Sequence, residues 1–293
     1  MTRGHRRLLC GWLVAVMIAS VLGCGSATNE LADRKLDSQK SSVAPESSAS
    51  SVTEPKKLEE LTIAAASDLK FVLDELAEAF QKTRPEITIK TTFGSSGNLF
   101  AQITNDAPFD LFLAADIQYA HDLAEQGKGR KEDVFAYAQG HIVVWVPATS
   151  ELDLEELGIQ AVLDVRVKKV AIANPKHAPY GRAAEATLKS LGVYEQVSRK
   201  LVLGENIAQT TQFVESGAAD VGLIALSLAM APAMKDKGRF WQVPFNAYPQ
   251  LLQGGIILNR CEDPEAANEF KAYLIGEEGR STLRKYGFGL PGE

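Results

Sequence analysis

Four short segments of this 293-residue chain place small, hydroxyl-bearing or amide-bearing residues where an apolar run gives way to a helical pattern. They contain, in chain order, Ser67, the pair Ser95-Ser96, Tyr180 followed by Gly181, and Asn206 followed by Ile207. The first N–H groups of a helix have no partner inside the helix and carry a partial positive charge, so helix starts suit anions. Hydroxyls and amides also form strong hydrogen bonds to an anion without a countercharge. Together, the four segments predict a binding site for a small oxyanion.

Each of these residues also has an ordinary structural explanation. Ser67 and Asn206 stand where helix N-caps are expected, and serine and asparagine are favoured caps. The Ser95-Ser96 pair lies between glycines, as in many solvated turns. The functional hypothesis therefore depends on the joint occurrence of the four segments after successive strands, because ligands of open α/β sheets bind beyond the carboxyl ends of the strands.

The elements that must position these residues follow from the hydrophobic pattern. From Leu58 onward, short apolar runs alternate with amphipathic stretches, which predicts an α/β fold with parallel sheets. The expected strands are 61–66, 87–93, 109–114, 141–146, 170–173, 201–203, 221–225 and 251–258. The clearest expected helices are 182–191, 207–215 and 264–275, and 174–181 is expected to be a loop.

The C-terminal segment 247–293 is too short to form a domain of its own, so we expect it to complete a lobe begun earlier in the chain. This predicts a first lobe formed by 58–140 plus 247–293 and a second formed by 141–246. Two crossing segments, near 139–145 and 243–250, would join them. A cleft between the lobes would let the four segments face one another.

The N-terminus has the pattern of a secretory signal over residues 1–23. Three arginines precede an apolar run at 8–22, which is short for a membrane-spanning helix and ends in Gly23 and Cys24. Cys24 resembles the acylated cysteine of a bacterial lipobox, and the serine-rich stretch that completes 24–57 predicts a disordered tether. We expect a lipid-anchored protein, periplasmic or on the cell surface; the alternative is an uncleaved membrane anchor.

Charge and cysteine content restrict the function further. Removal of the signal leaves 28 basic and 37 acidic residues, a net charge of −9. This balance argues against nucleic acid as a partner and against long-range attraction of anions. Only Cys261 remains beyond Cys24, so no intrachain disulfide is expected. An anion receptor with this charge must bind through local geometry.

Four motifs together resemble the periplasmic molybdate-binding proteins of ABC importers; they are the segments 64–69, 93–99, 110–116 and 174–181. The order and spacing agree from about Leu61 to the C-terminus. The resemblance implies a two-lobed type II periplasmic-binding-protein fold that closes on molybdate or tungstate. It also implies a monomer without a cofactor, which delivers its ligand to a permease and ATPase. By position, Ser67 and Ser96 would donate hydroxyl and backbone hydrogen bonds, and Tyr180 and Ile207 would each present a backbone N–H.

Two positions bear on selectivity. Some members of the resembled family use a tyrosine where this chain has Ala225, and the phenol of Tyr180 is a candidate replacement. Asp68 lies beside the expected site, and a residue at a helix start can aim its carboxylate outward while its N–H faces the ligand. An inward carboxylate would favour a protonated oxyanion such as hydrogen phosphate, because such an anion needs an acceptor.

Three alternatives remain open from the sequence. The first is a receptor for sulfate, phosphate or another oxyanion, and the second is a purely structural lipoprotein. The third is an enzyme on the same fold, but the chain has no His-Glu-x-x-His, Gly-x-Ser-x-Gly, phosphate-loop lysine or paired-cysteine motif. His121, His141 and His177 are scattered, so surface or packing roles are expected for them, with no direct metal coordination by side chains.

Overall fold

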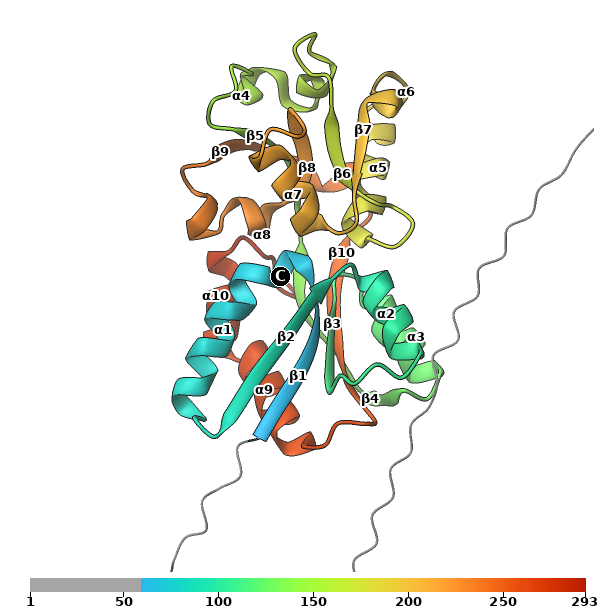
Figure 1. The fold of residues 1–293 in the computed structure, drawn as a ribbon, viewed down its shortest axis with the longest axis vertical. Helices are drawn as coiled ribbons and strands as arrows, with labels where there is room; N and C mark the ends of the chain where they lie inside the picture. The colour runs from blue at the N-terminus through green and yellow to red at the C-terminus, as the bar shows by residue number, and fades with distance from the viewer. Residues whose placement is uncertain (1–58) are drawn as a thin grey trace, which may run out of the picture. The chain divides into compact units, whose positions relative to one another are not determined.

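The computed structural model describes residues 59–293, which contain two five-stranded sheets. The first sheet has the strand order β2-β1-β3-β10-β4, and the second has the order β7-β6-β8-β5-β9. The first sheet fills the lower half of the view in Figure 1 and the second fills the upper half. The predicted signal segment, Cys24 and the tether lie outside the described residues.

The first sheet mixes strand directions. Its strands are β1 (Glu59–Ala66), β2 (Ile87–Gly94), β3 (Leu111–Ala114), β4 (Gly129–Gly140) and β10 (Leu251–Leu258). Strand β1 pairs in parallel with β2 and β3, whereas β10 is antiparallel to β3 and β4. The expected parallel pairing therefore holds for β1, β2 and β3, but β10 is antiparallel because it returns from the other sheet and enters in the opposite direction.

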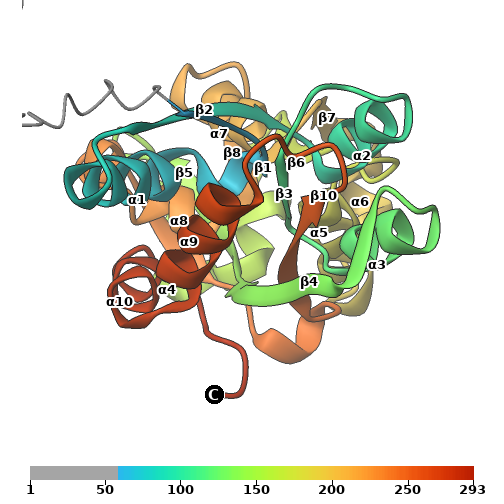
Figure 2. The same cartoon turned by 90° about the horizontal axis from the view of Figure 1, so that it is seen from below.

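Helices cover both faces of the first sheet. They are α1 (Lys70–Thr83), α2 (Ser96–Thr104), α3 (Gln118–Glu125), α9 (Pro264–Ile275) and α10 (Glu277–Lys285). In Figure 2, α1, α9 and α10 lie on one side of the strands, and α2 and α3 lie on the other. Successive residues of β3 alternate accordingly: Leu111 and Leu113 belong to one core cluster, and Phe112 to the other. Burial on both faces explains why this strand is entirely apolar.

The second sheet repeats this arrangement. Its strands are β5 (Ile142–Pro147), β6 (Val170–Ala173), β7 (Leu201–Gly204), β8 (Val221–Ala225) and β9 (Gly238–Gln242), and its helices are α4 (Leu154–Leu157), α5 (Pro179–Ser190), α6 (Tyr194–Val197), α7 (Ile207–Glu215) and α8 (Leu226–Ala229). Strand β6 is parallel to β7 and β8, and β5 is antiparallel to β8 and β9. Val214 of α7 shares a core cluster with Val143, and Ala184 of α5 shares a different one with Val144.

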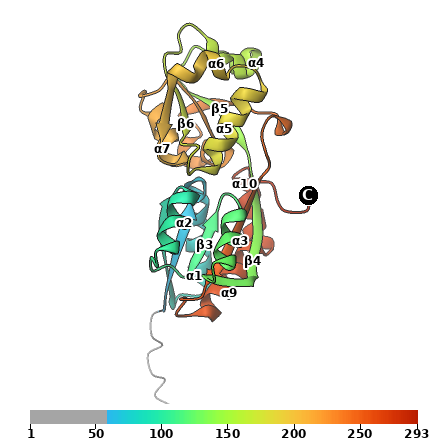
Figure 3. The same ribbon diagram turned by 90° about the vertical axis from the view of Figure 1, so that its right-hand side faces the viewer.

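The chain passes between the two sheets twice. Strand β4 ends at Gly140 and β5 begins at Ile142, so the first crossing is made at His141. The return lies between Gln242, the end of β9, and Leu251, the start of β10. Figure 3 shows the two sheets from the side, with α2 and α3 in front of β3. No helix within 59–293 is both long and apolar enough to cross a lipid bilayer.

Several element boundaries differ from the sequence-based expectation. The strands 170–173, 221–225 and 251–258 are confirmed. Helix α5, however, begins at Pro179, so the predicted loop 174–181 is too long by three residues. Proline is well suited to the first position of a helix because its fixed φ is helical and its missing N–H needs no partner. Strands β4 and β9 and helix α10 were not predicted; β4 and β9 are edge strands with charged residues, which weakens their apolar signal.

Candidate functional site

One small cavity lies between the two sheets. We call it the inter-sheet cavity; the residues that line it are Ala66, Ser67, Asp68, Gly94, Ser95, Ser96, Ala115, Ala178, Pro179, Tyr180 and Ile207. The four residues predicted to bind the ligand are all among them. They come from the ends of β1 and β2 and from the starts of α2, α5 and α7, so the structure brings together segments up to 140 residues apart.

Ser67 leads from β1 into a short 3₁₀ turn, Ser67–Leu69, which precedes α1. It is not the helix N-cap that the sequence suggested, because the turn displaces the start of the α-helix to Lys70 and Leu69 occupies the cap position. The Ser67 hydroxyl oxygen instead accepts a hydrogen bond from the backbone N–H of Ala208, 3.4 Å away in α7. This bond connects the two sheets at the edge of the cavity.

The two serines of the Gly-Ser-Ser-Gly segment have different roles. Ser95 is the N-cap of α2; its hydroxyl accepts from the N–H of Asn98 at 3.4 Å and lies 3.0 Å from Nδ1 of His177. Ser96 is the first residue of the helix, and its hydroxyl oxygen accepts from the N–H of Ala115 at 2.9 Å. Within residues 59–293, the hydroxyl protons of Ser67 and Ser96 have no acceptor. Both protons are therefore free to be donated to a ligand.

The second sheet contributes two helix starts. Tyr180 is the second residue of α5 and Ile207 is the first residue of α7, so neither backbone N–H has an acceptor inside its own helix. Asn206 is the N-cap of α7, as predicted, and its side chain accepts from the N–H of Gln209 at 3.0 Å. Gly181 packs its Cα against the carbonyl of Ala173, where a β-carbon would collide with the backbone.

Direct bonds hold the residues around the cavity together. The N–H of Gly97 donates to the carbonyl of His177 at 2.9 Å, and Arg182 forms an ion pair with Asp116 at 2.8 Å. Each bond joins a residue next to the first sheet to one next to the second. The structure is therefore a closed arrangement in which the cavity walls already touch.

Asp68 is buried at the centre of this contact, with 1% of its surface exposed. Its Oδ2 accepts from the hydroxyl of Tyr180 at 3.0 Å and from the amide of Gln253 at 2.5 Å, while Oδ1 has no partner within the described residues. Of the two orientations that the sequence left open, the carboxylate takes the inward one, because Tyr180 and Gln253 draw the side chain into the interior. While it is ionised, this orientation favours a protonated oxyanion. Burial raises the pKa of Asp68 to about 6, and the hydrogen bonds from Gln253 and Tyr180 oppose that rise only in part.

The phenol of Tyr180 has therefore already donated its proton to Asp68. Ala225, where some members of the resembled family carry a tyrosine, is fully buried in β8. In this arrangement the backbone N–H of Tyr180, rather than its hydroxyl, is the group left to face a ligand.

Sequence reasoning missed the side chains that support Asp68. Gln253 donates to it, and Tyr137 in turn donates to Oε1 of Gln253 at 2.9 Å. Ser227 donates to the backbone carbonyl of Asp68 at 2.9 Å. The sequence does contain one signal, because Gln253 is the polar residue of an otherwise apolar strand. The structure shows that it is fully buried, and a buried amide requires hydrogen-bond partners, here Asp68 and Tyr137.

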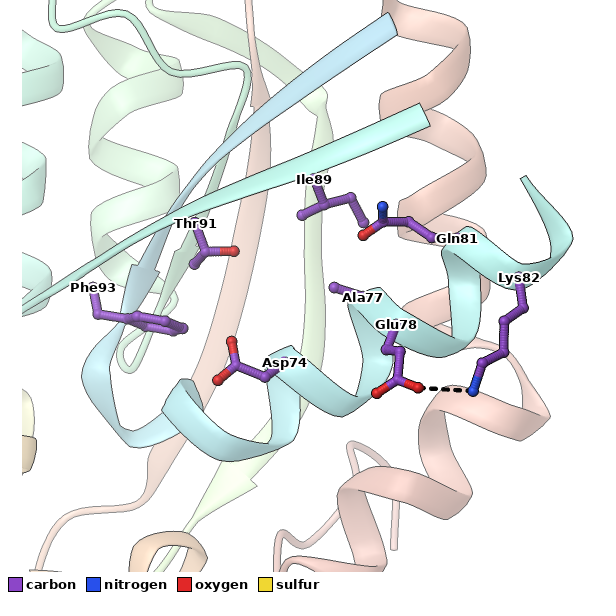
Figure 4. A pocket seen from close by; sticks show the side chains of 8 residues that line it. All are labelled: Asp74, Ala77, Glu78, Gln81, Lys82, Ile89, Thr91 and Phe93. Carbon is purple, nitrogen blue, oxygen red and sulfur yellow. Dashed lines mark ion pairs between the residues drawn. The ribbon is translucent and has the colours of Figure 1, made fainter. Parts of the chain in front are cut away.

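A second depression differs in chemistry. It is a groove beside α1 and the edge strand β2, lined by Asp74, Ala77, Glu78, Gln81, Lys82, Ile89, Thr91 and Phe93 (Figure 4). The ammonium of Lys82 is paired with Glu78 at 2.9 Å. Because its other charged groups are carboxylates and no helix starts there, the groove does not suit an anion. Within residues 59–293, no group of three or more histidine, cysteine, aspartate or glutamate residues could hold a metal ion.

Closure of the cavity requires a glycine at position 97. A β-carbon there would lie 2.6 Å from the carbonyl oxygen of His177, closer than atoms can pack. The Gly97→Ala variant is therefore expected to disfavour the closed arrangement and to weaken ligand binding by about tenfold, because only the closed population binds fully. Titration calorimetry of both proteins would measure this, with Gln102→Ala as the control, because Gln102 is an exposed residue of the same helix, α2. Equal affinities for Gly97→Ala and the unchanged protein would contradict it.

Comparison with known proteins defines the class. Residues 61–289 match the family model described as bacterial extracellular solute-binding protein, and the chain belongs to this family. It is 36% identical to the molybdate-binding protein of Azotobacter vinelandii over 79% of this chain and 90% of that protein. It is 35% identical to the molybdate-binding protein of Rhodobacter capsulatus over 80% of this chain and 90% of that one. The solved structure of the Azotobacter vinelandii periplasmic molybdate-binding protein superimposes with a TM-score of 0.72 at 30% identity, covering 79% of this chain and 99% of that one. The fold is accordingly the two-lobed α/β fold of periplasmic binding proteins.

Proposed function

We propose that this protein is an extracytoplasmic receptor that captures molybdate or tungstate and delivers it to the permease and ATPase of an ABC importer. The observation that carries the proposal is the arrangement of donors around the inter-sheet cavity. Within the described part of the chain, two serine hydroxyls with free protons and two helix-start N–H groups without an acceptor line one closed space. The two relatives at 35–36% identity, both named for molybdate, support this choice among oxyanions.

In this proposal, Ser67 and Ser96 donate hydroxyl hydrogen bonds from the first sheet, and Tyr180 and Ile207 donate backbone N–H bonds from the second. Among residues 59–293, no lysine or arginine lines the cavity. A tetrahedral dianion offers acceptors in every direction and no donor, so it matches these four donors. Sulfate has the same charge and shape, and we expect its smaller size to leave it with longer and weaker bonds.

We further propose that the first lobe comprises 58–140 plus 247–293 and the second comprises 141–246, with the crossings at His141 and 243–250 as the hinge. The membership of the strands in the two sheets supports this division. Ligand binding would then draw the lobes together, which is how hinged receptors retain small ligands. The same proposal includes secretion through a signal at 1–23 and a lipid anchor at Cys24. It also includes a monomeric state and the lack of enzymatic activity.

Titration calorimetry of the purified protein with molybdate, tungstate, sulfate and phosphate tests the function. We expect molybdate and tungstate to bind in a one-to-one ratio with dissociation constants of about a micromolar or lower, on the scale where binding contributes roughly 8 kcal/mol. Sulfate and phosphate should bind much more weakly. Tighter binding of sulfate or phosphate than of molybdate would replace the proposed ligand, and the absence of binding by all four would refute an oxyanion receptor.

A further inference from the structure

One carboxyl group, that of Asp68, lies on the wall of the inter-sheet cavity and is not used by the proposed donor set. Its side chain is 1% exposed, and its Oδ1 has no hydrogen-bond partner within the described residues. Its Oδ2 already accepts two hydrogen bonds, from Tyr180 and Gln253. An ionised oxygen without a partner in the interior is unfavourable, whereas a protonated one becomes a donor.

Among the described residues, the groups packed around Asp68 supply no positive charge to offset its own. They are Tyr137 of β4, Tyr180 of α5, Ser227 of α8 and Gln253 of β10. Helices α2 and α7 also begin at the cavity; α2 has no charged residue, and the single one in α7 is at its last position, Glu215. Lys70 is the charged residue closest to Asp68 in sequence, but within the described residues it forms no hydrogen bond or ion pair with the carboxylate, and its ammonium lies 5.7 Å from the centre of the Phe71 ring.

An oxyanion in the cavity would bring a second negative charge to the same wall. Two like charges in one buried site disfavour each other's ionised form, and the more weakly acidic group takes up a proton. The N–H groups and hydroxyls can satisfy the oxyanion, but Oδ1 of Asp68 has no comparable donor. The carboxyl group is therefore the one that should change its protonation state.

We propose that capture of a divalent oxyanion in the inter-sheet cavity is coupled to the uptake of one proton by Asp68. The inference rests on the proposed function, because it requires an anionic ligand. The protonated carboxyl presents a donor rather than an acceptor, so it favours an anion that has no proton of its own. Asp68 is thus a specificity-determining residue as well as part of the contact between the two sheets.

The raised pKa of Asp68 supports this coupling. Burial has already moved the pKa to about 6, so a further rise caused by the bound anion would cross neutral pH. Above pH 6 the free protein is mostly ionised at this residue, and binding must then recruit the proton from solution. By linkage, the dissociation constant should rise by roughly tenfold per pH unit in this range.

Calorimetric titration with molybdate at about pH 7.5, repeated in buffers with different ionisation enthalpies, measures the protons taken up. The unchanged protein should take up close to one proton per anion, and its affinity should fall as the pH rises from about 6.5 to 8.5. This measurement needs no variant, so it remains decisive even if a substitution impairs folding.

Variants assign the proton to a residue. In Asp68→Asn the amide oxygen can still accept from Tyr180 and Gln253, and its NH₂ replaces the protonated oxygen; we expect no proton uptake and an affinity independent of pH. Asp133→Asn is the matched control, because Asp133 is also buried but is paired with Arg130 at 2.7 Å. His177→Gln tests the imidazole that contacts Ser95 on the cavity wall. Both should retain the proton uptake of the unchanged protein.

The outcomes separate this inference from the proposed function. If molybdate binds with no proton uptake and with an affinity independent of pH, the coupling is refuted and the receptor function stands. Loss of proton uptake in His177→Gln, with uptake retained in Asp68→Asn, would likewise overturn the assignment to Asp68. Failure of all four oxyanions to bind would remove the function and the coupling together.

Discussion

Replacement of Asp68 by asparagine is expected to raise the free energy of unfolding by about 3 kcal/mol at neutral pH, even though the residue lies in the candidate site. The reason is that the carboxylate is buried without a positive partner, and its Oδ1 has no hydrogen bond within the described residues. The pKa of Asp68 rises from 3.8 to about 6 on folding. At about 1.4 kcal/mol per pKa unit, that difference sets the expected magnitude.

The size of the effect depends on pH. Below about 3.8 the carboxyl is protonated in both the folded and the unfolded protein, so its ionisation costs nothing. Between 3.8 and about 6 the folded protein binds more protons than the unfolded chain, and its free energy of unfolding falls as the pH rises. Above a pH of about 6, the free energy of unfolding has lost the whole contribution of this group. The advantage of the asparagine variant should therefore be small in acid and reach its full size above neutral pH.

Chemical denaturation of both proteins at several pH values, without ligand, measures this difference. The Asp133→Asn variant serves as the control: its carboxylate is buried beside Arg130, so removing the charge should not stabilise the protein. An Asp68→Asn variant that is less stable than the unchanged protein at about pH 8 would contradict the claim that the buried carboxylate destabilises the folded protein.

Removal of the Ser96 hydroxyl is expected to weaken molybdate binding by about 1–3 kcal/mol, or roughly 5- to 150-fold, the range for losing a hydrogen bond to a charged group. The hydroxyl oxygen accepts from the N–H of Ala115, and its proton remains for the anion. In Ser96→Ala, both the anion and the Ala115 N–H lose a partner. The loss should therefore appear in affinity and, to a smaller degree, in stability.

Calorimetry with Ser96→Ala gives the affinity, and thermal unfolding without ligand shows how much stability is lost. Ser216→Ala is a suitable control, because Ser216 is an exposed serine just beyond the end of α7, away from the cavity lining. Affinity within about twofold of the unchanged protein, a difference below about 0.5 kcal/mol, would exclude Ser96 from the donor set.

The candidate site could be predicted from the sequence because each of its donors is tied to a local pattern. Ser67 and Ser96 follow apolar runs, and Ile207 follows the N-cap Asn206 at the start of a periodic stretch. Such signals depend only on residues nearby in the sequence, so they can be recognised without knowledge of the fold. The predicted start of α5, at residue 182, is three residues too late, because the proline that begins the helix is also common in loops.

The environment of Asp68 could not be predicted in the same way. Its carboxylate is held by Tyr180 and Gln253, which are 112 and 185 residues away in sequence. Whether the side chain faces solvent or the interior depends on closure of the two sheets upon each other, and no local pattern encodes that contact. The antiparallel direction of β10 has a similar origin, because it depends on the route by which the chain returns from the second sheet.

The most direct test of capture by neutral donors is diffraction from crystals grown with molybdate, with the molybdenum located by its anomalous signal. We expect one molybdate in the inter-sheet cavity, with its oxygens about 2.6–3.2 Å from the hydroxyls of Ser67 and Ser96 and from the backbone nitrogens of Tyr180 and Ile207. No lysine or arginine should contact it. Molybdate bound elsewhere, or held in the cavity by a basic side chain, would contradict capture by neutral donors.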